Sequence, residues 1–320
     1  MKKEKNRIRK NVLCNVGVVF LAALLFAGCG KEEPVVDKPQ DYGVEEGEGT
    51  SETAGDEKKS DAGPAASSGE SAKEVPDSEM TEKNENFLCG CDISTLIAEE
   101  KSGVVYYNED GEKEDLCKIL ADHGVNLIRV RIWNDPYDKK GHGYGGGNCD
   151  VKNAIKIGKR ATKYGMPVMI DFHYSDFWAD PSKQMCPKAW EGMKIAEKAD
   201  ALYRYTMESL TEILDAGVDV SMVQVGNETT TGLSGETEWE NIAKLMKAGS
   251  KAVREISEKY GKEIKVVIQF TNPENTESYD SYASELKKYE VDYDVFASSY
   301  YPYWHGTLEN LRDVLKNVID

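Results

Sequence analysis

From residue 87 to residue 320, short apolar runs alternate with longer stretches in which apolar residues recur every three or four positions. Runs of the first kind predict strands, and stretches of the second kind predict amphipathic helices. The predicted strands span residues 87–93, 125–133, 167–174, 220–227, 264–270 and 293–301. The predicted helices span residues 112–124, 150–165, 194–216, 238–260, 279–289 and 307–320. This part of the chain therefore contains six strand–helix units.

Sustained alternation of strands and helices predicts an α/β fold with a parallel sheet. The two architectures that fit are a doubly wound open sheet and a TIM (β/α)8 barrel. Polar and aromatic residues directly follow several different strands, as in "IWNDP", "DFHYSDFW", "VGNE" and "SYYPYWHG". This favours the barrel, because its functional residues gather at the C-terminal ends of the strands. No GxGxxG or Walker sequence opens a predicted helix. We therefore predict a TIM barrel, with about six of its β/α units in this chain.

The first 85 residues differ in composition from the rest of the chain. Residues 1–29 combine a basic start, "MKKEKNRIRK", with the apolar stretch "GVVFLAALLFAG" and end at Cys29. This pattern is typical of a bacterial lipoprotein signal peptide, after whose removal Cys29 carries the lipid; an ordinary export signal is the alternative. Residues 30–85 are rich in Glu, Gly, Ser and Ala and predict a disordered acidic linker. We expect residues 86–320 to form the barrel domain. We expect the protein to be lipid-anchored at the extracellular face of a bacterial membrane, or secreted.

Charge and cysteine content limit the partners further. The net charge of −17 repels the phosphate backbone of nucleic acids, so we do not expect the protein to bind them. Beyond residue 29 five cysteines remain, no CxxC pair occurs, and the four histidines are scattered, so no metal site is expected. We interpret these cysteines as buried thiols; one disulfide bond between two of them is the alternative.

The strand patterns place several polar side chains on one face. Because side chains alternate along a strand, Arg129, Arg131 and Trp133 share a face, as do Asp171 and His173. With Glu228 at a strand end, they predict a polar site inside the barrel; a set of internal salt bridges is the alternative. Aromatic residues crowd the same strand ends. They indicate flat platforms for sugar rings.

These segments together resemble a known family. "GCDISTL", "GVNLIRVRIWNDPYD", "GHGYGGGNCD", "DFHYSDFWADP", "MVQVGNET" and "SYYPYWHGTL" are similar to the endo-β-1,4-galactanases of glycoside hydrolase family 53, from about Gly90 to the last residue. The resemblance implies a TIM barrel that cleaves β-1,4-galactan in type I arabinogalactan with retention of configuration. It implies no required cofactor, and leaves open a structural calcium ion in the C-terminal part beyond residue 320.

The resemblance also implies roles for individual residues. Glu228 matches the acid/base, and Asn227 matches the residue that hydrogen-bonds the sugar 2-hydroxyl. The other matches are polar residues near the nucleophile and aromatics of the sugar subsites, namely Arg131, His173, Tyr300, Trp133, Trp178 and Trp304. As general acid, Glu228 must carry a proton near neutral pH, so its pKa must be raised. Repulsion from a nucleophilic carboxylate about 5 Å away is expected to be the main cause.

The sequence departs from the family pattern at the nucleophile. That residue should follow a seventh strand, so we expect it beyond residue 320, and we expect residues 30–320 alone to be inactive. Two other functions stay open: a related endo-glycanase acting on mannan or β-glucan, and a sugar-binding cell-surface lipoprotein without catalytic activity.

Overall fold

The computed structural model describes residues 18–20 and 87–319. The predicted linker, residues 30–85, and all but three residues of the predicted signal peptide lie outside the described residues. The three, β1 (Val18–Phe20), form a short strand that pairs in parallel with the first strand of the barrel domain.

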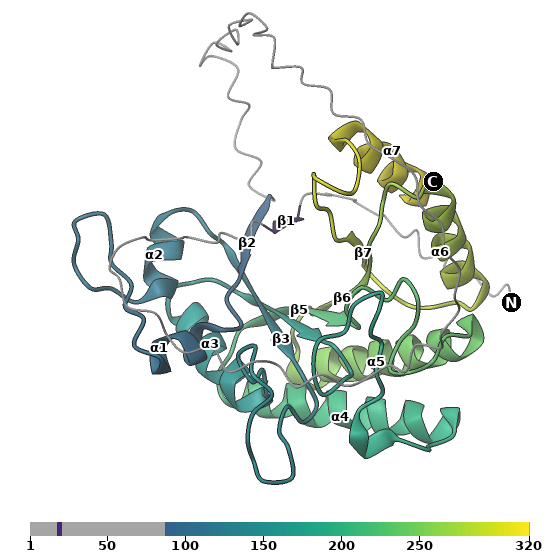
Figure 1. Ribbon diagram of the computed structural model, residues 1–320, viewed down its shortest axis with the longest axis horizontal. Coiled ribbons are helices and arrows are strands. Elements are labelled where there is room, and N and C mark those ends of the chain that lie inside the picture. The colour runs from purple at the N-terminus through teal and green to yellow at the C-terminus, as the bar shows by residue number, and fades with distance from the viewer. Residues whose placement is uncertain (1–17, 21–86, 320) are drawn as a thin grey trace, which may run out of the picture. The chain divides into compact units, whose positions relative to one another are not determined.

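The barrel domain contains the six predicted strands. They are β2 (Leu88–Asp92), β3 (Leu127–Ile132), β4 (Val168–Phe172), β5 (Val220–Val225), β6 (Lys265–Phe270) and β7 (Val295–Ser298). Each strand pairs in parallel with the next one along the chain, and helices lie outside the sheet (Figure 1). This order is that of a (β/α)8 barrel, in which every strand lies beside its successor.

The six predicted helices are also present. The helical segments are α1 (Leu96–Lys101), α2 (Leu116–Asp122), α3 (Val151–Lys163), the 3-10 turn η2 (Lys188–Trp190), α4 (Ile195–Asp215), α5 (Trp239–Tyr260), α6 (Thr276–Lys288) and α7 (Leu308–Ile319). Helix α1 was not predicted, because six residues are too few for a helical repeat of apolar positions to be read. None of the helices in the described residues is long and apolar enough to span a membrane.

Local capping explains where two helices begin. The Asp150 carboxylate accepts a hydrogen bond from the backbone N–H of Asn153, which confirms Asp150 as the N-cap of α3. Asp115 accepts from the N–H of Cys117 in the same way, so α2 starts at Leu116 and not at residue 112 as predicted. Position 261 lies in the left-handed region, with φ 60°, and its glycine ends α5.

The two faces of the sheet bury different side chains. Ile128, Val130 and Ile132 of β3, with the equivalent residues of the neighbouring strands, pack in the core that includes the helices. A second, smaller cluster lies on the opposite, inner face and consists of Leu127, Met169, Met222 and Val267. The next inward-facing position of each of these four strands is polar. The inner face therefore has an apolar floor with polar residues above it, toward the C-terminal ends of the strands.

Candidate active site

Four polar side chains stand directly above the apolar floor, one from each of four neighbouring strands. Arg129 on β3, Asp171 on β4, Gln224 on β5 and Gln269 on β6 form what we call the polar layer. Arg129 Nη2 donates to Asp171 Oδ2 at 2.6 Å. Gln224 Nε2 lies 2.8 Å from Asp171 Oδ1 and 2.9 Å from Gln269 Oε1. The polar layer is thus a continuous hydrogen-bonded chain across the inner face.

Arg129 is the positive centre of this site. Besides Asp171, its guanidinium donates to Asp92 Oδ2 at 2.7 Å and to Asn227 Oδ1 at 2.8 Å. Burial opposes the charge of Arg129, but Asp171 and Asp92 outweigh it and raise the pKa of the guanidinium. Burial likewise opposes the charge of Asp92, yet Arg129 and Arg131 lower the pKa of that carboxyl. The site therefore holds Asn227 against a fixed positive charge.

Hydrogen bonding defines the tautomer of His173. Its Nδ1 accepts from Trp133 Nε1 at 3.2 Å and from the backbone N–H of Ala179 at 3.0 Å. Because both partners are donors, Nδ1 carries no proton, and the neutral ring bears its proton on Nε2. Nε2 lies 3.0 Å from Asp171 Oδ2. His173 is 1% exposed. Its contacts with Trp133, Ala179 and Asp171 therefore hold the ring in one orientation in the buried part of the site.

The backbone after β5 turns sharply to present Glu228. Its φ is 45°, in the left-handed region, and that of Gly226 is 92°. A Cβ at position 226 would lie 2.5 Å from Thr229 Cγ2, so only glycine fits there. The backbone N–H of Glu228 donates to Gln269 Oε1 at 3.0 Å, and the N–H of Thr229 donates to the Gln269 carbonyl at 3.0 Å. The strained turn is therefore held by β6.

Burial raises the pKa of Glu228 above its usual range, and it is the largest cause of the shift. The negative charge of Asp180 raises it further, whereas a hydrogen bond from Ser299 and the nearby charge of Arg129 lower it. The nucleophilic carboxylate from which we expect repulsion lies outside the described residues, so a contribution from it to the pKa of Glu228 stays a prediction. Desolvation in the turn after β5 thus shifts the equilibrium of Glu228 toward its protonated form.

The predicted residues Arg131, Trp133 and Trp178 lie together beside His173. The guanidinium of Arg131 stacks 4.2 Å from the ring centre of Trp178 and donates to Asp92 Oδ1 at 3.1 Å. Trp178 is 38% exposed and can present its ring to a ligand, whereas Trp133 is 0% exposed. The prediction that Trp133 offers a surface to a sugar is therefore wrong for this structure. Its ring instead supports His173 and Trp178 from below.

The loop after β7 carries the remaining predicted aromatics. Trp304 is 72% exposed. The hydroxyl of Tyr300 donates to the carbonyl of Gly306 at 2.7 Å, within its own loop. Burial and then the charge of Glu228 raise the pKa of Tyr301, so Tyr301 is the loop tyrosine that senses the Glu228 charge. The loop thus brings Tyr301 within electrostatic range of Glu228; a substrate contact by Tyr300 stays a prediction.

Gln224, Gln269 and Ser299 are among the site residues that were missed as functional candidates. Gln224 and Gln269 lie inside apolar strands, where each is the one amide side chain. Their inward position, two residues after an apolar floor residue, was the available signal. Ser299 follows β7 directly, but serine is too common at strand ends to be singled out from the sequence.

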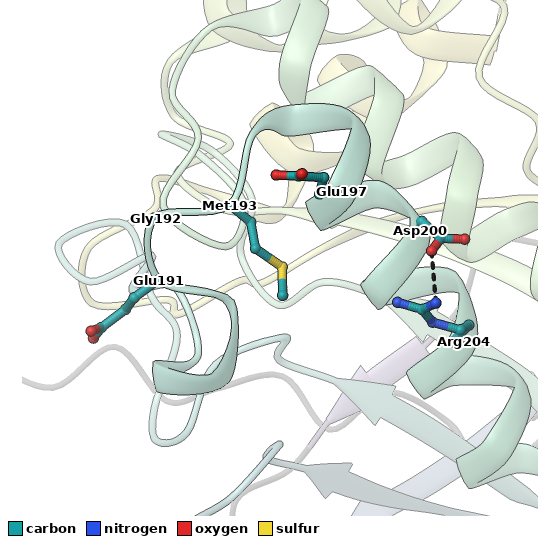
Figure 2. Close-up of a pocket in the computed structure, with 6 residues that line it drawn as sticks. All are labelled: Glu191, Gly192, Met193, Glu197, Asp200 and Arg204. Carbon is teal, nitrogen blue, oxygen red and sulfur yellow. Dashed lines mark ion pairs between the residues drawn. The ribbon is translucent and has the colours of Figure 1, made fainter.

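A shallow hollow lies elsewhere on the surface. It encloses about 410 Å³ and is lined by residues from the loop before α4 and the first turns of α4, namely Glu191, Gly192, Met193, Glu197, Asp200 and Arg204 (Figure 2). Asp200 and Arg204 form an exposed ion pair at 3.0 Å. The hollow shares no residue with the Glu228 site. In residues 18–20 and 87–319, no group of three or more His, Cys, Asp or Glu side chains is arranged to hold a metal ion.

Consecutive parallel β/α units, with an acidic residue and a buried polar layer at the C-terminal ends of the strands, fit part of a TIM-barrel enzyme. The sequence model of glycosyl hydrolase family 53 matches residues 88–320, and the chain belongs to this family.

Two curated relatives show how far the similarity extends. The chain is 55% identical over 235 residues to an endo-beta-1,4-galactanase of Bacillus subtilis (strain 168), covering 73% of this chain and 54% of the relative. It is 38% identical over 242 residues to an arabinogalactan endo-beta-1,4-galactanase of Cellvibrio japonicus (strain Ueda107), covering 72% and 62%. The chain thus spans between half and two thirds of these relatives.

Solved structures agree with the fold. The Ignisphaera aggregans GH53 catalytic domain matches with a TM-score of 0.67 and 39% sequence identity, over 71% of this chain and 63% of that chain. A structure of fungal beta-1,4-galactanases matches with a TM-score of 0.64 and 32% identity, over 72% of this chain and 69% of that chain. The predicted TIM-barrel class, with six β/α units in this chain, is confirmed.

Proposed function

We propose that the full-length protein is a retaining endo-β-1,4-galactanase, which hydrolyses internal β-1,4-galactosidic bonds of type I arabinogalactan. The observation that carries the proposal is Glu228, a half-buried carboxyl with a raised pKa that follows β5 in a chain of family 53. The galactanase names of the relatives from B. subtilis and C. japonicus support the choice of substrate.

In the first step, Glu228 acts as general acid. A sugar alkoxide is a poor leaving group, so the glycosidic oxygen must take a proton as its bond to the anomeric carbon breaks. Because burial favours the protonated carboxyl, Glu228 holds that proton at higher pH than an exposed glutamate. Asn227, positioned by Arg129, would hydrogen-bond the sugar 2-hydroxyl as positive charge develops on the ring.

A retaining mechanism also needs a nucleophilic carboxylate, which forms a glycosyl-enzyme that water then hydrolyses with Glu228 acting as base. Two described carboxylates near Glu228 are occupied otherwise. Asp171 is fully buried between Arg129 and His173, and Asp180 Oδ1 accepts two hydrogen bonds from Ser182. We therefore expect the nucleophile outside the described residues. The reaction uses these side chains and water and requires no cofactor.

The test is hydrolysis of purified β-1,4-galactan by the full-length protein, with β-mannan and cellulose as control substrates. We expect oligosaccharides from galactan, and an NMR time course in which the β-anomer of the new reducing end appears first. Release from mannan or cellulose alone would assign a related endo-glycanase. Calorimetric binding of galactan without new reducing ends would indicate a sugar-binding protein, and α-anomers appearing first would exclude the retaining mechanism.

We further propose that Cys29 anchors the protein by a lipid at the extracellular face of a bacterial membrane. The basic start, the apolar stretch and the small residues before Cys29 support this. Cell fractionation with Cys29→Ser tests it: the wild-type protein should sediment with membranes and label with palmitate, and the variant should not label. Equal palmitate labelling of both forms would contradict the anchor.

A further inference from the structure

The starting observation concerns the side-chain amide of Gln269 on β6. Its Oε1 lies 3.0 Å from the backbone nitrogen of Glu228 and 2.9 Å from Gln224 Nε2. A backbone N–H can only donate, so the atom facing it must be the amide oxygen. This determines the orientation of the amide without any choice between oxygen and nitrogen. Gln269 Nε2 must then point the other way, toward β7.

The amide of Gln269 in turn orients Ser299. Gln269 Nε2 donates to Ser299 Oγ at 3.1 Å, and the backbone N–H of Ser299 donates to the carbonyl of Phe270 at 2.9 Å. The serine oxygen is therefore an acceptor toward Gln269. A hydroxyl has one proton to donate, and that proton is free to point elsewhere. Gln269 contacts both Ser299 and the backbone of Glu228, so the serine hydroxyl lies on the Glu228 side of the polar layer. A hydrogen bond from Ser299 is also one of the influences that lower the pKa of the Glu228 carboxyl.

Gln269 thus contacts Glu228 along two routes. Its amide oxygen accepts directly from the backbone N–H of Glu228, and its amide nitrogen holds the serine hydroxyl that influences the Glu228 carboxyl. Both routes start from one side chain that is 5% exposed. The position of the carboxyl relative to the polar layer is therefore set by β6 and by the end of β7.

Other charged or titratable groups also face the Glu228 carboxyl. Arg129 on β3 favours its charged form, and Asp180, in the loop after β4, opposes it. The neutral ring of His173, after β4, also lies near the carboxyl. Tyr301, in the loop after β7, and Tyr279, on α6, also sense the Glu228 charge. Among these neighbours, Ser299 is the side chain whose hydroxyl is held by a residue of the polar layer.

We propose that Ser299 is a positioning residue for the acid/base: its hydroxyl, oriented by Gln269, donates a hydrogen bond to the Glu228 carboxylate. The inference rests on the proposed function. In the first step Glu228 is protonated and needs no such donor. In the second step it must be a carboxylate that removes a proton from water. A donor that stabilises the carboxylate makes the base form available in surroundings that otherwise favour the acid.

The test compares Ser299→Ala with Ser299→Thr in the full-length protein. Removal of the hydroxyl should raise the pKa of Glu228, because a donor to the charged form is lost. The alkaline limb of the kcat/KM profile on galactan should therefore move to higher pH in Ser299→Ala. Ser299→Thr keeps a hydroxyl and should restore the wild-type profile. A merely structural role would lower activity at all pH values without moving the limb.

A second readout does not depend on substrate. In protein labelled with ¹³C at the glutamate carboxyl carbon, the resonance that disappears in Glu228→Gln reports the titration of Glu228. We expect its midpoint to rise in Ser299→Ala and to return in Ser299→Thr. An unchanged or lower midpoint in Ser299→Ala would overturn the proposal, even if galactan is hydrolysed. A raised midpoint in a protein that leaves galactan intact would support the Ser299 contact and contradict the proposed function.

Discussion

Glu228 combines two features that cost free energy in the folded state. Its backbone lies in the left-handed region with φ 45°, and its carboxyl is half-buried with a raised pKa. An acid whose pKa is higher in the folded state binds more protons there than in the unfolded chain. Stability therefore falls as pH rises through the interval between the two pKa values. The penalty is absent below the unfolded value, about 4.3, and complete above the folded value.

Replacing Glu228 by Gln should therefore stabilise the protein at pH 7. The amide keeps the shape of the side chain but cannot ionise, so the cost of burying a carboxylate disappears. We expect a Tm higher than wild type by on the order of 2–4 °C at pH 7 and close to wild type at about pH 4. Differential scanning calorimetry at the two pH values checks this. A variant less stable than wild type at pH 7 would show that the carboxylate is favourably paired.

The same substitution should remove most of the activity. A positioned general acid contributes about 10²–10⁴ to the rate, so Glu228→Gln should lose about a hundredfold or more on galactan. An aryl galactoside with a good leaving group needs little protonation, so its first aryl release should slow much less. Rapid-mixing measurement of that release separates the two steps. Equal losses on both substrates would show that Glu228 is not the acid.

The sequence identified which residues lie at the strand ends, but it did not identify the contacts that these residues make. Asn227 and Glu228 could be identified because a Gly-Asn-Glu sequence after an apolar run has no core-packing explanation. The sequence could not show that Trp133 is buried, because an aromatic residue at a strand end gives the same sequence pattern whether it faces a ligand or packs in the interior. The pairing of Gln269 with Ser299 depends on the distance between β6 and β7, which no local pattern encodes.

At the scale of elements, an ion pair fixes the loop that follows Glu228. Lys198 on α4 is 6% exposed and donates to Glu236 Oε1 at 2.5 Å and to the carbonyl of Ser234 at 3.1 Å. The other oxygen of Glu236 accepts from Asn241 Nδ2 at 2.9 Å. The loop between β5 and α5 is thus attached both to α4 and to the first turn of α5.

Changing Lys198→Met should destabilise the protein by about 3 kcal/mol, because it leaves the Glu236 carboxylate partly buried without its cation. The matched control is Lys244→Met, which removes an exposed pair with Glu240, whose side chains are 47% and 65% exposed. That change should leave the urea midpoint close to that of the wild type, because exposed ion pairs contribute little. Urea unfolding, compared at equal m-value, measures both. Similar costs for the two variants would show that the Lys198 pair contributes no more than a surface pair.

A second element-scale prediction concerns the contact between α5 and the sheet. Helix propensity alone predicts that Gly249→Ala stabilises by about 1 kcal/mol. A Cβ there would lie 2.6 Å from Val225 Cγ1 and 3.1 Å from the Tyr174 hydroxyl. The overlap should dominate, with a net cost of about 1–3 kcal/mol. In the double variant with Val225→Ala, the added methyl should cost less than in the wild-type background. Additive costs in this cycle would show that the contact with Val225 is unimportant.

At the scale of the whole barrel domain, the sequence predicted the strand order and the side on which the site lies. Both follow from one rule: consecutive β/α units place successive strands side by side, with their C-terminal ends together. The two-residue alternation of inward positions predicted the polar interior. What it could not predict was how the polar residues pair, since several pairings of Arg129, Arg131, Asp92 and Asp171 fit the same pattern.

The charge of the domain leads to a prediction about substrates. Residues 86–320 hold 39 Asp and Glu against 28 Lys and Arg, so the domain repels anions over a Debye length. Galactan is uncharged, and we expect its kcat/KM to change less than about twofold between about 20 mM and 300 mM NaCl. Galactan partly oxidised to carboxylates should be cleaved more slowly at low salt and recover as salt screens the repulsion. The matched comparison uses both polymers at equal chain length. A strong fall of galactan cleavage with salt would mean that ion pairs, and not hydroxyl and aromatic contacts, hold the substrate.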